Sequence, residues 1–111
     1  MIEITIVKNK TSRRIMIEAK GHAETAPEGK DLLCAAVSSQ MMGFARAVKA
    51  VGEPRIKSGK ICVDFGDGVV DVIAATGKVY KKIETYLVPV EEALEAYKKA
   101  FPEAIKILRN A

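Results

Sequence analysis

The sequence predicts an α+β fold in which two long helices pack on a largely antiparallel sheet, in the element order β-β-α-β-β-α. Three patterns predict it: a strand-like alternation of apolar and polar residues at the start, two long segments with apolar residues at helical spacing, and a glycine-punctuated segment between them. The strand-like residues are 2–7 and 15–20, and the helical ones are 31–51 and 78–101. Residues 105–107 leave room for a short last strand.

The first two strands predict a β-hairpin. Isoleucine recurs at every second position within each strand, at Ile2, Ile4, Ile6, Ile15 and Ile17. Turn-favouring residues separate the strands at Asn9–Ser12, and Gly21 ends the second strand. Residues 23–30 are small, charged or turn-favouring, and they predict a loop that leads into the first helix.

The first helix is predicted to begin at Asp31, a favourable N-cap residue, and to end near Val51, where Gly52 follows. Its main apolar stripe comprises Leu33, Val37, Met41, Phe44, Val48 and Val51. Further apolar residues outside that stripe, such as Leu32 and Met42, predict a helix that is covered on more than one side. Packing against the second helix and packing against a partner subunit would each account for this width.

The segment between the helices predicts two or three strands, with a hairpin turn at Gly66-Asp67-Gly68. The strand-like runs are Arg55–Ser58, Ile61–Phe65 and Val69–Ala75, with Gly59 between the first two. The second helix keeps its apolar rhythm across Pro89, which predicts one kinked helix that Pro102 ends.

Length and composition indicate one domain spanning residues 1–111. The chain is 49% hydrophobic, and a domain of this size buries about two-thirds of its unfolded surface. An apolar run of about 18 residues and a signal-peptide pattern are both absent from the sequence, so we expect a cytoplasmic protein with no membrane partner and with reduced thiols. One histidine and two separated cysteines lack the paired spacing of a zinc site, and we expect no metal and no cofactor.

The charge pattern argues against sequence-specific nucleic-acid recognition. The net charge is +4, the basic residues are scattered, and aromatic residues make up 5% of the chain. No pattern of stacking aromatics or zinc knuckles accompanies the basic residues. We therefore expect contact with nucleic acid to be at most weak and non-specific.

His22 and Cys34 are the candidate catalytic pair. Cysteine attacks as a thiolate, so it needs a neighbouring base or a positive local potential. A helix that begins at Asp31 would place Cys34 in its first turn, where the helix dipole favours the thiolate. His22, at the end of the second predicted strand, is the candidate base. Asp31 either orients the imidazole or only caps the helix.

The spacing of these residues does not by itself exclude simpler roles. A free cysteine usually packs as a small hydrophobic residue. Ser38, one turn beyond Cys34 on the same helix face, either supports the site or bonds to its own helix backbone. Cys62 lies mid-strand without a nearby histidine or helix start, which indicates a structural role.

A family resemblance adds specificity to this pair. The run Gly21-His22-Ala23, followed after a short loop by Gly29-Lys30-Asp31-Leu32-Leu33-Cys34-Ala35-Ala36-Val37-Ser38, resembles the signature of the ribosomal-processing cysteine protease family Prp. The resemblance continues more weakly over the whole chain, and the segment Phe101–Lys106 is similar to the family's Tyr-Pro ending. It implies a catalytic dyad of His22 and Cys34, with Asp31 and Ser38 at neighbouring signature positions.

The resemblance also implies an activity and partners. It implies a cysteine endopeptidase that removes the N-terminal extension of large-subunit ribosomal protein twenty-seven during ribosome assembly, and a homodimer. Two other classes stay open. A non-catalytic ribosome-associated binding module would bind RNA in a salt-sensitive way without cleaving a peptide. A redox-sensing thiol protein would need a resolving cysteine close to Cys34, and Cys62 has the wrong setting for that.

Overall fold

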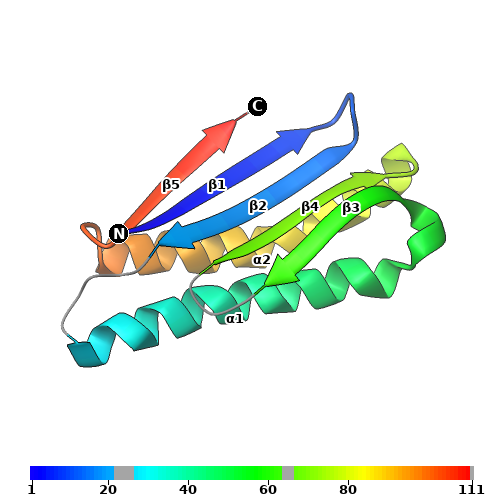
Figure 1. Cartoon of the computed structure of the whole chain (residues 1–111). Coiled ribbons are helices and arrows are strands. Elements are labelled where there is room, and N and C mark those ends of the chain that lie inside the picture. Colours follow the sequence, from blue (N-terminus) through cyan, green and yellow to red (C-terminus); the bar gives the residue numbers. More distant parts are fainter. Residues whose placement is uncertain (22–26, 64–66, 111) are drawn as a thin grey trace.

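The strands and helices follow one another in the order β-β-α-β-β-α-β (Figure 1). The computed structural model describes residues 1–21, 27–63 and 67–110, with residues 27–31 placed in a helix but without side-chain detail. The elements are β1 (Ile2–Asn9), β2 (Arg14–Gly21), α1 (Pro27–Val51), a short 3-10 turn η1 (Glu53–Arg55), β3 (Ile56–Val63), β4 (Gly68–Ala74), α2 (Gly77–Ala100) and β5 (Ile105–Asn110). The predicted α+β class and element order are confirmed, and a last strand is present.

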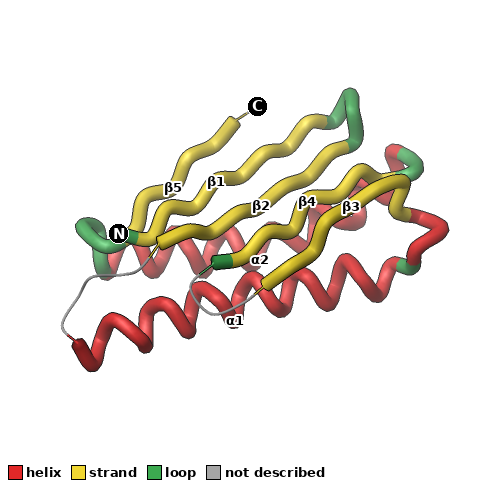
Figure 2. Tube along the Cα trace, in the orientation of Figure 1, coloured by secondary structure: helices red, strands yellow, loops and turns green. Residues whose placement is uncertain are grey.

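Among the described residues the strands form a five-stranded sheet in the order β3-β4-β2-β1-β5. All neighbouring strands are antiparallel except β1 and β5, which run parallel. Each helix is therefore a crossover between strands that point the same way, with α1 joining β2 to β3 and α2 joining β4 to β5. The two crossovers start from antiparallel strands and move in opposite directions across the sheet. Right-handed connections then place both helices on the same face, as Figure 2 shows.

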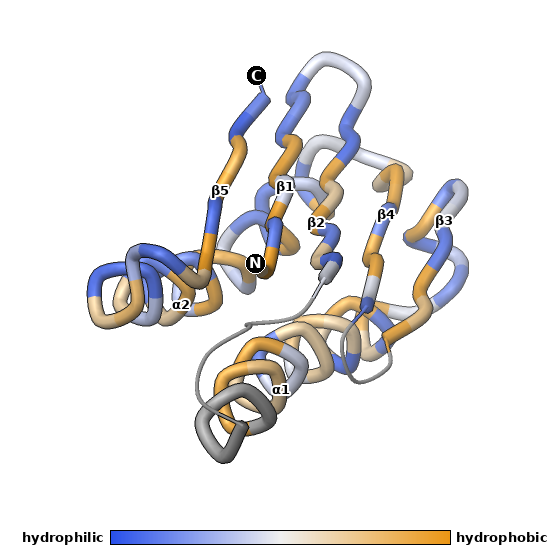
Figure 3. The backbone as a smooth tube through the Cα atoms, turned by 60° about the vertical axis from the view of Figure 1, so that its left-hand side comes forward, coloured by the Kyte–Doolittle hydropathy of each residue, from blue (hydrophilic) through white to orange (hydrophobic). Residues whose placement is uncertain are grey.

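The core lies between that face and the two helices. The strands contribute alternate residues, and Figure 3 shows hydrophobic and hydrophilic stretches alternating along the strands. The largest fully buried side chains include Ile2, Ile4, Ile6, Ile15 and Ile17 from the strands, Met41, Phe44 and Val48 from α1, and Ile83, Leu87 and Leu94 from α2. No helix in the described part of the chain is long and apolar enough to cross a membrane.

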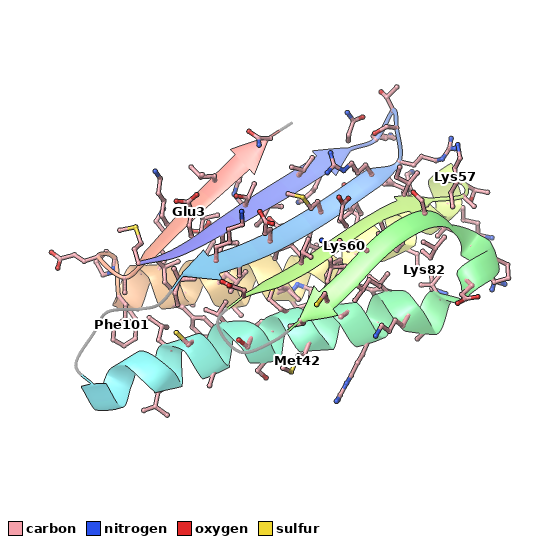
Figure 4. All side chains as sticks on the ribbon, in the orientation of Figure 1. Glu3, Met42, Lys57, Lys60, Lys82 and Phe101 are labelled. Carbon is pink, nitrogen blue, oxygen red and sulfur yellow. The ribbon has the colours of Figure 1, made fainter. Side chains whose placement is uncertain are left out.

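The predicted apolar stripe of α1 is buried in full, but the residues beside it are not. Leu32 is 72% exposed, and Met42 is half-buried and points away from the sheet in Figure 4. The packing of α1 alongside α2 therefore covers only part of the wide apolar surface that the sequence indicates.

The structure corrects the predicted start of the first helix, and it decides between the two and the three strands predicted between the helices. The first helix begins at Pro27 rather than Asp31, because proline is well suited to the first helical position, where no N–H is needed. The end of the predicted loop, residues 27–30, is therefore helical. Strand β3 also continues through Gly59, where a Cβ atom would lie 2.9 Å from Cγ1 of Val72. The glycine thus permits close strand pairing and does not end a strand.

Charged side chains link neighbouring elements of the fold. On the outer sheet face, Arg14 makes two hydrogen bonds of 2.9 Å to the carboxylate of Asp71 across β2 and β4. On the helix side, Arg109 of β5 binds Glu91 and Glu95 of α2, and Lys8 of β1 contacts Glu91 at 2.5 Å. The ion-pair network therefore holds the parallel edge strand against α2.

Candidate active site

Cys34 lies on α1 at the end of the sheet where β1 begins and β2 ends. The residue is half-buried and its thiol is free. It lines a narrow pocket of about 10 Å³, roughly the space of one water molecule. The other lining residues are Ile2, Ala19, Val37, Ser38, Met41, Val63, Asp67 and Gly68. Four strands thus supply the wall opposite the thiol.

Ser38 lies one helical turn beyond Cys34 and faces the same pocket. It is 5% exposed, and within the described part of the chain it is the one polar residue buried to this degree. Ser38 and Cys34 thus line the same pocket, and a supporting role for Ser38 stays a prediction. Its burial places a hydroxyl group next to an otherwise mostly apolar pocket.

The other two predicted site residues, His22 and Asp31, lie outside the side chains that the structure describes. His22 lies outside the described residues, and Asp31 is described only by its place in α1. The Cys34–His22 pair therefore stays a prediction. Asp31 is the fifth residue of α1, so it is not the N-cap residue.

The corrected helix start also changes the expected environment of Cys34. Cys34 follows the first helical residue, Pro27, by seven positions, which is about two turns. The influence of the helix dipole falls off within the first turn. The expectation that Cys34 sits in that first turn was wrong, and the dipole does not supply its activation.

The described residues do show how the chain approaches His22. Gly21, the last residue of β2, has a φ of +92°, and a Cβ atom there would lie 2.3 Å from the carbonyl oxygen of Met1. Its backbone N–H donates a hydrogen bond of 3.1 Å to Oδ1 of Asp67. The glycine conformation and the hydrogen bond together fix the backbone at Gly21, which directly precedes His22 in the sequence.

The sequence interpretation did not identify Asp67 as a site residue. Gly66-Asp67-Gly68 was interpreted only as a hairpin turn, a role consistent with the antiparallel pairing of β3 and β4. Pairing of β4 with β2 brings Asp67 to the end of β2, where it lines the pocket of Cys34. A carboxylate between two glycines was the available signal, but only the long-range strand pairing shows what it contacts.

Cys62 lies on the outer face of the sheet, away from the pocket of Cys34. It is exposed and its thiol is free. With Lys20, Lys60 and Asp67 it borders a shallow outer hollow of about 420 Å³. Within the described residues, no group of three histidine, cysteine or acidic side chains is arranged to hold a metal ion.

Comparison with known proteins identifies the family. A family model described as cysteine protease Prp matches residues 1–106. The chain belongs to the Prp family. The chain that carries Cys34 in its pocket therefore belongs to a family of cysteine proteases. No curated protein matches the sequence.

Solved structures show that the Prp fold extends over the whole chain. The essential ribosomal processing protease Prp from S. aureus, with a covalently linked product peptide, is 19% identical with a TM-score of 0.72, covering 99% of this chain and 100% of that one. The same protease with a substrate peptide is 18% identical with a TM-score of 0.71 and the same coverage. SMU.848 from Streptococcus mutans is 24% identical with a TM-score of 0.70, covering 99% and 96%.

Proposed function

We propose that this chain is a cytoplasmic cysteine endopeptidase that removes the N-terminal extension of large-subunit ribosomal protein twenty-seven during ribosome assembly. Membership of the Prp family supports a cysteine protease, and two similar structures are of a ribosomal processing protease that holds a peptide. The observation that carries the proposal is the partly accessible thiol of Cys34, which lines a pocket at the sheet end where Gly21 leads to the only histidine.

The proposed mechanism uses Cys34 as nucleophile and His22 as base. His22 takes the thiol proton while Sγ of Cys34 bonds to the scissile carbonyl carbon. The bond from that carbon to the peptide nitrogen then breaks, and His22 returns the proton to the leaving amine. Water, deprotonated by His22, hydrolyses the thioester and restores the thiol. Ser38 supports the pocket beside the thiol, and Asp31 stays a candidate partner of the imidazole.

The test uses a peptide that copies the extended N-terminus of the ribosomal protein, under reducing conditions. Cys34→Ala should abolish cleavage and keep peptide binding, because the nucleophile is lost while most substrate contacts stay. Cys62→Ala is the matched control and should cut normally. Cleavage by the Cys34→Ala variant, or none by the wild type, contradicts the proposal. Binding without any cleavage would favour a ribosome-associated binding module instead.

A further inference from the structure

The end of the molecule opposite Cys34 carries a cluster of basic residues. Lys10 and Arg13 come from the turn between β1 and β2, and Lys78 and Lys81 come from the start of α2. Together with Gly77 and Tyr80 they line an open groove of about 540 Å³, and no acidic residue is among the lining residues that the structure describes. We call these four residues the basic end.

The charges of the basic end are not neutralised by neighbours. Some basic residues elsewhere in the described chain pair with carboxylates, namely Lys8, Arg14, Lys20 and Arg109. The ammonium groups of Lys10, Lys78 and Lys81 form no ion pair with any residue in the described ranges. Figure 4 places Lys57 and Lys82 at the same end of the molecule. The N-terminus of α2, which opens into the groove at Gly77, adds positive potential.

Arg13 is held in a fixed place within this cluster. Its Nε donates a hydrogen bond of 3.0 Å to the carbonyl oxygen of Ala74, and its own carbonyl accepts one of 2.9 Å from the N–H of Ala74. Its φ is +59°, a left-handed conformation that glycine or asparagine adopts more easily. The guanidinium is therefore anchored at the rim of the groove, where a flexible side chain would be expected.

We propose that the basic end binds the phosphate backbone of RNA. Four unneutralised cations around an open groove are complementary to a chain of phosphates, and they recognise charge rather than sequence. The choice of ribosomal RNA as the biological partner rests on the proposed function. An anionic membrane fits less well, because the large exposed apolar residues of the described chain lie outside this groove, at Met1, Leu32, Val88, Phe101 and Leu108.

The position of the basic end separates RNA contact from peptide cleavage. Strand β1 runs from Ile2, in the pocket of Cys34, to Asn9, next to Lys10. At the usual rise per residue this length is about 25 Å. RNA held at the basic end therefore leaves the thiol uncovered. It also raises the local concentration of a substrate segment that belongs to the same ribosomal particle.

The test compares two double variants of equal charge on the same helix. Lys78→Gln with Lys81→Gln removes two charges from the basic end, and Lys98→Gln with Lys99→Gln removes two from the other end of α2. Affinity for a fluorescein-labelled single-stranded RNA is measured by anisotropy over a series of salt concentrations. The first variant should reduce the salt slope by about 1.4 and bind about 25-fold more weakly than wild type at about 0.1 M salt. The second should bind like the wild type.

Three outcomes overturn the proposal: equal weakening in both variants, no RNA binding by the wild type, or preference for phosphatidylglycerol vesicles over RNA at the same salt. Cleavage of the free extended peptide is measured in parallel, and both variants should cut it at the wild-type rate. Failure of the wild type to cut this peptide would contradict the proposed protease function alone. RNA binding would still decide the role of the basic end.

Discussion

Removal of the Asp67 carboxylate should slow peptide cleavage without unfolding the protein. Oδ1 of Asp67 accepts the hydrogen bond from the N–H of Gly21 at 3.1 Å, and Gly21 directly precedes the proposed base, His22. A hydrogen bond of this kind contributes about 1 kcal/mol. If that energy holds the chain that carries the base, Asp67→Ala lowers kcat/KM about fivefold. The residue is exposed, so its loss leaves the core intact.

The assay measures kcat and KM on the extended peptide together with the Tm of each variant. Asp67→Asn keeps an acceptor oxygen and should stay within about twofold of the wild-type kcat/KM. Wild-type kinetics in Asp67→Ala would refute a positioning role. An asparagine variant as slow as the alanine variant would refute the hydrogen-bond argument and indicate that the charge of the carboxylate matters. A Tm lowered in proportion to activity would indicate a general loss of structure.

Two further predictions concern stability. Burial opposes ionisation of Glu91, but hydrogen bonds from Lys8 and Arg109 outweigh it and hold the pKa of the carboxyl below its ordinary 4.5. The stabilisation from Glu91 is then present at neutral pH and is lost as the pH falls below 4.5. Glu91→Gln should therefore lower the Tm measurably at pH 7, and the Tm of this variant should fall less than that of the wild type as the pH is lowered. Curves of Tm against pH that run parallel for the two proteins would contradict this. Leu87→Ala removes a side chain from the core and should lower the free energy of unfolding by about 2–5 kcal/mol. Leu32 is 72% exposed, so Leu32→Ala should change the free energy of unfolding by less than about 0.5 kcal/mol. Equal losses in the two variants, measured by denaturant titration, would contradict this prediction.

The sequence was sufficient for elements that depend on local periodicity. Isoleucines at alternate positions predicted the first hairpin, and the stripe from Leu33 to Val51 predicted the buried face of α1. Such patterns report which side of an element meets the core, whatever it packs against. The parallel pairing of β5 with β1 could not be predicted in this way, because it joins segments about one hundred residues apart in sequence through the α2 crossover.

Competition between two helix-start signals explains the error at α1. Pro27 and Asp31 are both favourable near a helix start, and local preferences alone do not rank a proline at the first helical position against an N-cap four residues later. Asp67 was missed for a different reason. A turn residue becomes part of a site only when its hairpin pairs with another strand, and β4 pairs with β2 far along the chain.

The corrected start of α1 changes the proposed mechanism. The sequence suggested two ways in which the thiol of Cys34 could lose its proton: stabilisation of the thiolate by the helix dipole, and proton transfer to a base. The helix begins two turns before the thiol, which removes the first source. The base must then carry the activation, and its placement depends on the backbone that leaves β2 at Gly21. The hydrogen bond between Gly21 and Asp67 is therefore important for the proposed mechanism, because a misplaced imidazole would leave Cys34 without a proton acceptor.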